Sequence, residues 1–539
     1  MRILPAGDTA LLVELDTLAQ ATALLASLVA DPIPGAGEPV PGARTLLVPF
    51  RPHAVSASGL AAALRSRPLV RPDDDVARVV DIPTVYDGED LTSLAALLGW
   101  SPEELVRRHT AATWTVGFMG FAPGFSYLTC TDPAWPQVPR LGSPRTRVPA
   151  GAVALAGPYA GVYPRVSPGG WQLVGQTDAA IWDATRTPPV LWAPGDVVRF
   201  QPVPPDAVNA TRRAPGAEPA PIVPGADATP DLDAGRAVLV VDAGRGTLIQ
   251  DLGRTGVAHL GVGQSGAADP RSLRAANRAV GNPPGAAAIE TEGLLRIRAS
   301  GDVVVALTGA LVTAHVRRDA AGGGVRERPA PSSVPFLLHD GEELALGEPT
   351  RGRRTYVAMR GGVDVPVTLG SRSTDTLGGV GPAPLTAGTV LPVGADVAAA
   401  VETGDVGAPD PASLPTPGQT TTLRIVVGPH PDWFDDGAAT LTAQEWEVTA
   451  LADRVGIRLA GRPLRRTAAR ADAELPSEGM VTGAVQVPPN GQPILFLPDH
   501  PVTGGYPPVA VVVTADLPLL GQLPTSARVR FARTDEPGA

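Results

Sequence analysis

The residues best suited to chemistry lie in three loops that combine glycine, aromatic side chains and arginine. The loops cover 117–128 (GFMGFAPGFSYL), 140–151 (RLGSPRTRVPAG) and 167–175 (SPGGWQLVG). Glycine lets a backbone approach a ligand closely, and the planar fork of arginine matches carboxylate or phosphate. Together the loops predict a rigid pocket for a small, flat, anionic molecule. The alternative is that they are only hairpin turns of a β-barrel.

The first loops contain both binding and catalytic candidates. The predicted substrate-binding residues here are Pro123, Gly124, Phe125, Tyr127, Arg140, Pro168, Gly169 and Gly170. Arg145 is a candidate catalytic charge clamp, with a surface salt bridge as the alternative. His109 ends an amphipathic helical segment, so it is either a site residue or a histidine that favours the helix dipole.

These loops resemble the B subunit of 5-oxoprolinase, also described as KipI-like or as allophanate hydrolase subunit 1. The typical pattern is GF-x-PGF-x-YL, then PR-x-x-SPR-x-x-VPAG, then SPGGW, and the chain carries all three in this order. The segments 86–91 and 103–110 also fit. Ser126 departs from the pattern, because proline is usual at that position.

The second half resembles the partner of that protein, the C subunit of 5-oxoprolinase, which is also called KipA-like. Its opening signature is TLIQDLGR at 247–254. The further matching segments are 265–269, 275–277, 280–282, 361–363, 369–374, 453–456, 483–488 and 499–507. The resemblance covers nearly the whole chain, which is therefore identified as a fusion of two subunits. The carboxyltransferase region of urea carboxylases has the same make-up.

The second half supplies the remaining candidates. Gln250, Asp251 and Arg254 are predicted catalytic residues, although an Asp–Arg pair that fixes a turn explains them equally well. Asn277 is predicted to bind substrate or to brace a helix, and Glu290 to act as a base, a metal ligand or a buried partner of arginine. The other predicted substrate-binding residues are Gln486, Thr503, Gly504, Gly505 and Tyr506.

The fold is predicted to be mainly β with some α. Short apolar runs between turns indicate many short strands, and the resemblance implies cyclophilin-like β-barrel domains in tandem after a small N-terminal α/β domain. The predicted parts are an α/β domain at 1–80, a barrel like that of the B subunit at 81–205, a Pro- and Ala-rich linker at 206–235, a β-rich domain at 236–415 and a second barrel at 416–535.

The sequence contains no lysine, and all 44 of its basic residues are arginine. A P-loop needs a lysine on the phosphates, Schiff-base chemistry needs a lysine amine, and covalent biotin also attaches to lysine. The chain therefore cannot contain a P-loop, a Schiff-base lysine or covalently attached biotin. Any positively charged group that binds an anion must be arginine.

Charge and composition exclude further classes. A net charge of −10 argues against general binding of nucleic acid or anionic membranes. The N-terminus lacks an apolar signal core, which makes the cytoplasm the expected location. Cys130 is the single cysteine, and paired-cysteine and HExxH spacings are absent, so no metal site is predicted.

Two enzyme functions and one binding function follow from the resemblance. The first is ATP-dependent hydrolysis of 5-oxoproline with a LamB/YcsF-type partner, the A-type component of 5-oxoprolinase, using ATP and Mg²⁺. The second is carboxyl transfer to urea or a similar small amide from biotin carried by another protein. The third is KipI-like regulation of a kinase, which would explain only the first half. Assembly of the chain into a homo-oligomer is a further alternative.

Overall fold

The computed structural model describes residues 1–69, 77–142, 145–206, 235–319, 324–471 and 473–534. The chain is mainly β with barrel-like sheets, which confirms the predicted fold class. The predicted linker at 206–235 lies almost entirely outside the described residues. No helix in the described ranges is long and apolar enough to cross a membrane.

The N-terminal domain is a four-stranded antiparallel sheet in the order β1-β2-β4-β3, packed against two helices. Its elements are β1 (Arg2–Pro5), β2 (Ala10–Glu14), α1 (Leu18–Ala30), β3 (Val40–Pro41), β4 (Thr45–Pro49) and α2 (Ala57–Ser66). Thr17 and Ser56 cap the two helices by accepting hydrogen bonds from backbone N–H groups three residues on. Buried leucines on both helices, including Leu24 and Leu60, form the core against the sheet.

The next domain is a seven-stranded sheet in the order β12-β9-β10-β7-β6-β13-β5. Its elements are β5 (Val79–Thr84), α3 (Leu91–Leu97), α4 (Pro102–Ala111), β6 (Trp114–Met119), β7 (Ser126–Cys130), β9 (Ala152–Ala156), β10 (Tyr159–Val162), β12 (Gln172–Gln176) and β13 (Val197–Pro202). Val85 and Gln176 exchange backbone hydrogen bonds of 2.9 and 2.8 Å across the two edges, which closes the sheet. A separate pair, β8 (Arg145–Val148) and β11 (Ser167–Gly169), lies beside it.

The third domain is a ten-stranded sheet with one helix. Its elements are β14 (Ala237–Asp242), β15 (Leu248–Gln250), η1 (Ala258–Leu260), α6 (Pro270–Val280), β16 (Ala288–Thr291), β17 (Arg296–Ser300), β18 (Val303–Asp319), β19 (Val325–Pro329), β20 (Phe336–Leu338), β21 (Glu343–Met359), β22 (Gly361–Val363) and β23 (Val390–Asp396). The Asp269 side chain accepts from the Ser272 N–H to cap α6, and Pro270 provides its first turn. Gly281 ends the helix at a φ of 74°.

The C-terminal domain, reached through η2 (Pro411–Ser413), is a closed seven-stranded barrel. Its strands are β24 (Thr420–Val427), β25 (Glu445–Ala452), β26 (Gly456–Ala460), β28 (Ala484–Gln486), β29 (Ile494–Phe496), β31 (Pro508–Val512) and β32 (Arg528–Arg533). Its helical turns are η3 (Pro431–Trp433), α7 (Ala439–Thr442), η4 (Ala468–Arg470), η5 (Thr514–Asp516) and α8 (Leu517–Gly521). The short strands β27 (Glu478–Gly479) and β30 (Thr503–Gly504) pair beside the barrel.

The two barrels share one strand connectivity. Around the first barrel the order is β5-β12-β9-β10-β7-β6-β13, and around the second it is β24-β31-β28-β29-β26-β25-β32. In both, the first strand runs parallel to the last. A buried tryptophan occupies the same place: Trp114 donates to the His109 carbonyl at 3.0 Å, and Trp446 to the Leu441 carbonyl at 2.9 Å. The barrels are therefore two copies of one topology.

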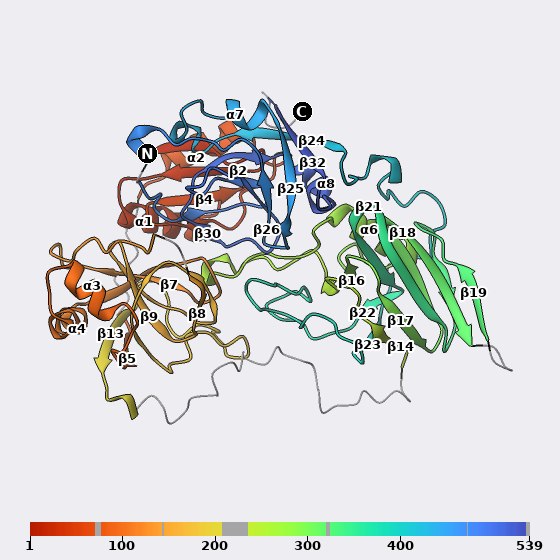
Figure 1. Ribbon diagram of the computed structural model, residues 1–539, viewed down its shortest axis with the longest axis horizontal. Helices are drawn as coiled ribbons and strands as arrows, with labels where there is room; N and C mark the ends of the chain where they lie inside the picture. Colours follow the sequence, from red (N-terminus) through yellow and green to blue (C-terminus); the bar gives the residue numbers. More distant parts are fainter. Residues whose placement is uncertain (70–76, 143–144, 207–234, 320–323, 472, 535–539) are drawn as a thin grey trace.

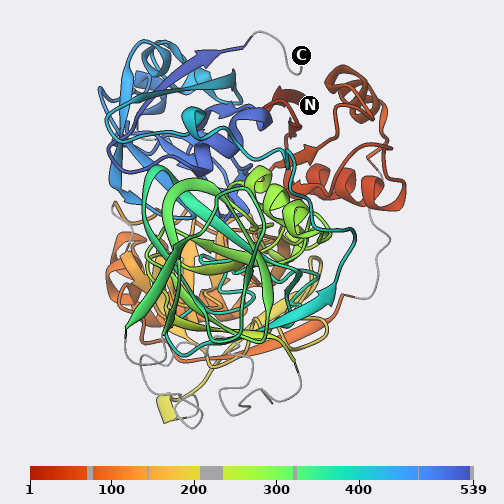
Figure 2. The same ribbon diagram turned by 90° about the vertical axis from the view of Figure 1, so that its right-hand side faces the viewer.

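The two halves of the chain pack directly on each other (Figure 1). The N-terminal domain, red, lies beside the blue C-terminal barrel, where the Ala43 N–H donates to the Ser477 carbonyl at 2.7 Å. The Gly124 N–H of the first barrel donates to the Leu260 carbonyl at 2.9 Å. The N–H of Phe121 reaches the Thr503 hydroxyl at 2.9 Å. Figure 2 shows the same arrangement turned by 90°, with the N-terminal domain again beside the C-terminal barrel.

These contacts predict that the halves stay together when the chain is cut between 206 and 235. A protease site engineered there should give two fragments that co-elute on a sizing column at micromolar concentration, because apolar and polar contacts join them independently of the linker. Separate elution of the two fragments would show that the interface is too weak to hold them.

Candidate functional site

A cavity of about 500 Å³ lies between the two barrels. The first barrel contributes Phe121, Phe125, Tyr127, Arg140, Leu141, Gly142, Tyr163, Gly169, Gly170 and Trp171. The second contributes Arg466, Ala471, Ala473, Glu474, Ser477, Gln486, Pro489, Phe496, Pro501, Thr503, Gly504, Gly505 and Tyr506. Neither barrel surrounds this cavity alone, so the site depends on their contact.

Two similar turns line the cavity, one from each barrel. One is Gly169-Gly170-Trp171 at the end of β11, and the other is Gly504-Gly505-Tyr506 at the end of β30. A Cβ on Gly169 would lie 2.2 Å from the Tyr163 hydroxyl, and one on Gly504 would lie 2.7 Å from the Gln486 amide nitrogen. The buried Tyr163 ring therefore leaves no room for a side chain at Gly169, whereas a side chain at Gly504 would displace the ends of Gln486 and Met480.

Aromatic rings form the wall on the side of the first barrel. Phe125 meets Tyr127, Tyr163 and Trp171 edge to face, with ring centroids 5.2–5.3 Å apart. Burial raises the pKa of Tyr163 well above its ordinary value, so its hydroxyl keeps its proton at neutral pH. The wall is therefore rigid and apolar, with hydroxyl groups at its rim.

The charged groups of the cavity come from both barrels. Arg140 of the first barrel pairs with Glu474 of the second, with Nε and Oε2 3.2 Å apart. Arg466 donates to the Ala473 carbonyl at 3.0 Å and lies over the Trp433 ring, and its Nε has no partner among the described residues. Two guanidinium groups and one carboxylate thus surround a space that suits a small anionic or zwitterionic molecule.

The structure places ten of the predicted site residues in this cavity. They are Phe125, Tyr127, Arg140, Gly169, Gly170, Gln486, Thr503, Gly504, Gly505 and Tyr506. The sequence interpretation missed Phe121, Tyr163, Trp171, Arg466, Glu474 and Ser477. Phe121 and Trp171 lie in the loops 117–128 and 167–175, so the same glycine-aromatic pattern could have predicted them. Arg466 and Glu474 lie outside every motif.

Three residues predicted for the first barrel lie beside the cavity rather than in its wall. Gly124 is buried, and its N–H bonds the Leu260 carbonyl of the third domain. Pro123 is buried against Gly378 of the same domain. Pro168 is exposed within β11. Gly124 and Pro123 therefore connect their loop to the third domain.

Ser126 occupies the position where the family pattern has proline. Its side chain is fully buried, accepts a hydrogen bond of 2.7 Å from the Trp192 indole, and lies 3.2 Å from the Gly124 carbonyl. The hydroxyl thus ties the loop to the barrel core.

Arg145 does not line the cavity, in contrast to the sequence prediction for a charge clamp. Its Nη2 donates to Asp90 Oδ1 at 2.7 Å and its Nε lies 3.3 Å from Glu89. A further contact of 3.5 Å reaches the Trp171 carbonyl. Two carboxylates already occupy the guanidinium, so its position supports the alternative of a salt bridge, here one that braces the Trp171 turn.

His109 also lies away from the cavity, in the hydrophobic core of the first barrel. It is 1 % exposed, its Nδ1 is 2.7 Å from the Tyr86 hydroxyl, and its ring centroid is 4.5 Å from that of Phe200. Burial lowers the pKa of His109 to about 3, so the imidazole is neutral. A catalytic role does not fit this position, because the ring is buried and does not line the cavity.

The TLIQDLGR motif forms a buried turn behind the cavity. Asp251 accepts hydrogen bonds from the Ser371 hydroxyl, the Arg372 N–H and the Gly253 N–H at 2.6–2.8 Å. Gln250 donates to the Thr374 carbonyl at 2.9 Å. The turn is therefore fixed as the alternative expected, but by these contacts with 371–374 and not by a hydrogen bond between Asp251 and Arg254.

Arg254 is buried in the same region. Its Nη2 donates to the Ser373 carbonyl at 2.5 Å, whereas its Nε and Nη1 have no partner in the described part of the chain. Burial lowers its pKa, although the nearby carboxylates of Asp375 and Asp251 act in the opposite direction. Arg254 is therefore a structural cation of the third domain rather than a wall of the cavity.

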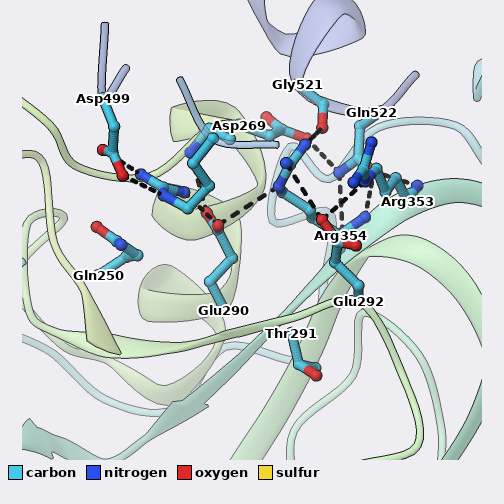
Figure 3. Close-up of polar contacts among 12 residues, drawn as sticks. Gln250, Asp269, Glu290, Thr291, Glu292, Arg353, Arg354, Asp499, Gly521 and Gln522 are labelled. Atoms are coloured by element: carbon cyan, nitrogen blue, oxygen red, sulfur yellow. Dashed lines mark hydrogen bonds and ion pairs between the residues drawn. The ribbon is translucent and has the colours of Figure 1, made fainter. Parts of the chain in front are cut away.

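Glu290 belongs to a buried ionic network that joins the third domain to the second barrel (Figure 3). It pairs with Arg454, lies 3.5 Å from Arg354, and accepts from the Tyr356 hydroxyl at 2.6 Å. Arg454 also donates to Asp499 at 3.0 Å. Glu290 is therefore a buried partner of arginine, which is one of the three roles predicted for it.

Asn277 braces the end of α6, the second of its two predicted roles. Its Nδ2 donates to the Ala286 carbonyl at 2.8 Å, and its Oδ1 accepts from Asn282 at 3.1 Å. In the described residues no cluster of three or more His, Cys, Asp or Glu side chains is arranged to hold a metal ion.

Comparison with known proteins identifies both halves. The family model described as carboxyltransferase domain, subdomain C and D, matches residues 1–192, and the model for subdomain A and B matches residues 260–533. The chain belongs to this carboxyltransferase-domain family. The C/D subdomains thus hold the first barrel and the A/B subdomains hold the second, with the cavity between them.

Characterised relatives of each half are separate subunits. The C/D half is 38% identical over 205 residues to the B subunit of 5-oxoprolinase from Escherichia coli O157:H7, covering 36% of this chain and 93% of the relative. The A/B half is 36% identical over 285 residues to the C subunit of 5-oxoprolinase from Escherichia coli K12, covering 52% and 86%. Urea amidolyase of Lachancea kluyveri is 32% identical over 301 residues, which are 52% of this chain and 16% of that protein.

Crystal structures of one protein match nearly the whole chain. The crystal structure of TTHA0988 is 34% identical and superposes with a TM-score of 0.80 over 97% of this chain and 99% of that one. The arrangement of the carboxyltransferase subdomains on one chain is therefore shared with a second protein.

The low pKa of His109 predicts acid sensitivity of the first barrel. Its folded pKa lies below the unfolded value of about 6.5, so its contribution is present above pH 6.5 and is lost as the pH falls toward 3. Between pH 7 and pH 5 the wild type should lose about 2 kcal/mol more stability than His109→Gln, which cannot titrate. Urea unfolding at both pH values measures this difference, and equal losses would show that His109 titrates normally.

Proposed function

We propose that this chain is the B/C component of an ATP-dependent 5-oxoprolinase, which opens 5-oxoproline to glutamate together with a separate LamB/YcsF-type partner. The observation that carries the proposal is the shared cavity. Relatives named as the B and C subunits match the two halves along most of their own length, and here those halves enclose one cavity between them. The proposed location is the cytoplasm.

The lactam of 5-oxoproline resists hydrolysis because its amide is resonance-stabilised. ATP, when bound, supplies a phosphoryl group that converts the amide oxygen into a leaving group. Arg140 and Arg466 would hold the substrate carboxylate or a phosphate, since both line the cavity. Fixed positive charge of this kind stabilises negative charge that develops during the reaction.

The cavity has features that suit a small cyclic amide. Its aromatic wall of Phe125, Tyr127 and Trp171 covers a flat ring, and the glycine turns let the backbone approach it closely. Glu474 is the only carboxylate among the described cavity residues. Mg²⁺ would therefore arrive bound to the nucleotide rather than to a preformed protein site.

Carboxyl transfer to urea or a similar amide is the second candidate, with biotin carried by another protein. It rests on the match to urea amidolyase, which spans 16% of that protein. The 5-oxoprolinase assignment is favoured because its subunits are matched over 86–93% of their length and in both halves. Regulation of a kinase by a KipI-like protein would leave the A/B half without a role.

The proposal predicts activity that depends on a partner. The purified chain alone should form little glutamate from 5-oxoproline, whereas addition of a LamB/YcsF-type partner, ATP and Mg²⁺ should give glutamate and ADP in equal amounts. Omission of each component is the control. Carboxylation of urea with a biotin carrier, without glutamate formation, would make the second candidate correct.

Arg140 provides a test of the cavity itself. Arg140→Ala should lower kcat/KM by about 30- to 1000-fold, because a charged contact is worth about 2–4 kcal/mol in a partly buried site. Its melting temperature should hardly change, since an exposed pair such as that with Glu474 contributes under about 1 kcal/mol. Arg140→Lys should recover only part of the activity.

A matched control is Arg199→Ala. Arg199 forms an exposed pair with Asp81 outside the cavity, and its loss should leave kcat/KM unchanged. Equal effects of the two alanine variants would show that Arg140 acts through general charge and not through the site.

A further inference from the structure

In each barrel, the loop after the first strand in chain order is hydrogen-bonded to the strand that comes next to last. That strand is β12 in the first barrel and β31 in the second, and the same two hydrogen bonds occur in both. In the first barrel the Gly88 N–H donates to Val174 at 3.3 Å and the Asp90 N–H to Leu173 at 3.0 Å. In the second barrel the N–H groups of Gly428 and His430 donate to the carbonyls of Val509 and Pro508, both at 3.0 Å. Asp90 and His430 therefore occupy equivalent positions.

Both residues then pair with a side chain of a short strand beside the barrel, with the acidic and basic partners exchanged. Asp90 accepts from Arg145 of β8 at 2.7 Å, and His430 Nε2 lies 2.9 Å from Glu478 of β27. Arg145 is the register partner of Gly169 in β11, and Glu478 is the register partner of Gly504 in β30.

Each pair thus lies directly behind one of the two turns that face the cavity. Arg145 is paired with Gly169, the first residue of the Gly169-Gly170-Trp171 turn. Glu478 is paired with Gly504, the first residue of the Gly504-Gly505-Tyr506 turn. Ser477, adjacent to Glu478, itself lines the cavity. A shift of Glu478 would therefore move both a wall residue and the turn.

The pair in the second barrel is the more deeply buried. The side chains of His430 and Glu478 are 4% and 2% exposed, against 10% and 22% for Asp90 and Arg145. The N-terminal domain covers it: a Cβ on Gly42 would lie 2.6 Å from the Ser477 carbonyl oxygen and 2.8 Å from the Glu478 Cα. Arg44 and Glu14 of that domain are the other charged groups that act on Glu478.

We propose that the buried pair of His430 and Glu478 is a positioning pair, which holds the Gly504-Gly505-Tyr506 turn in place to form one wall of the ligand site. It is the counterpart, with the acidic and basic partners exchanged, of the pair between Asp90 and Arg145, which holds the turn of the first barrel. A buried polar group that loses its hydrogen-bond partner is costly, so each pair restricts its own turn to one position. The inference rests on the proposed function only in taking the cavity as the ligand site.

Hydrogen exchange measured by mass spectrometry tests this without any substrate, so its failure is distinct from a failure of the proposed function. Glu478→Gln keeps the shape but removes the charge. It should raise exchange of the Thr503–Tyr506 amides roughly tenfold or more, while the Gly169–Trp171 amides and the strands of both barrels stay protected. Asp90→Asn should show the reciprocal pattern, with only the Gly169–Trp171 turn affected.

Glu478→Asp separates positioning from stability. It retains the charge, so it should keep more protection at 503–506 than Glu478→Gln even when both variants have the same melting temperature. His430→Gln, which retains a hydrogen-bond donor without the charge, provides a second variant where Glu478→Gln does not fold. The proposal is overturned when either neutral variant leaves exchange at 503–506 unchanged, or when both turns lose protection together with the barrel strands.

Discussion

The burial of Arg454 is the constraint on which the A/B half depends. Taking a guanidinium out of water is unfavourable unless its donors are satisfied. Glu290 of the third domain, Asp499 of the second barrel and the Gly266 carbonyl together satisfy it. Burial acts against the charged form, but the carboxylates of Asp499 and Glu290 outweigh it and raise the pKa of Arg454. Separation of the two domains would break the contacts of Arg454 with Glu290 and with the Gly266 carbonyl, although Arg454 would keep Asp499.

This network also determines the geometry of the ligand site. Asp499 lies two residues before Pro501, where the chain enters the cavity wall, and it accepts from the Thr376 N–H of the third domain at 2.9 Å. The first barrel is held against the same domain through Gly124 and Leu260. The third domain thus contributes no residue to the described cavity wall but fixes the distance between the two barrels that form it.

Duplication of one barrel topology gives the site its form. Because both copies carry a short strand pair that ends in a Gly-Gly-aromatic turn, their approach brings two such turns into the wall of one cavity. The copies differ in side-chain chemistry: aromatic residues dominate the wall of the first, and Arg466, Ser477 and Gln486 mark that of the second. Similar backbones therefore line one cavity with different side chains, although each copy contributes both charged and apolar groups, such as Arg140 from the first and Phe496 from the second.

The sequence by itself determined the family, the β-rich fold class and the loops of the cavity, because glycine turns and their neighbours are encoded locally by spacing. Only the tertiary structure decided which polar residues line the cavity. His109, Arg145, Asp251 and Glu290 are as polar as Arg140, yet burial and partners far along the chain direct them into packing and ion pairs. Such partners are set by how domains dock, which no local pattern specifies.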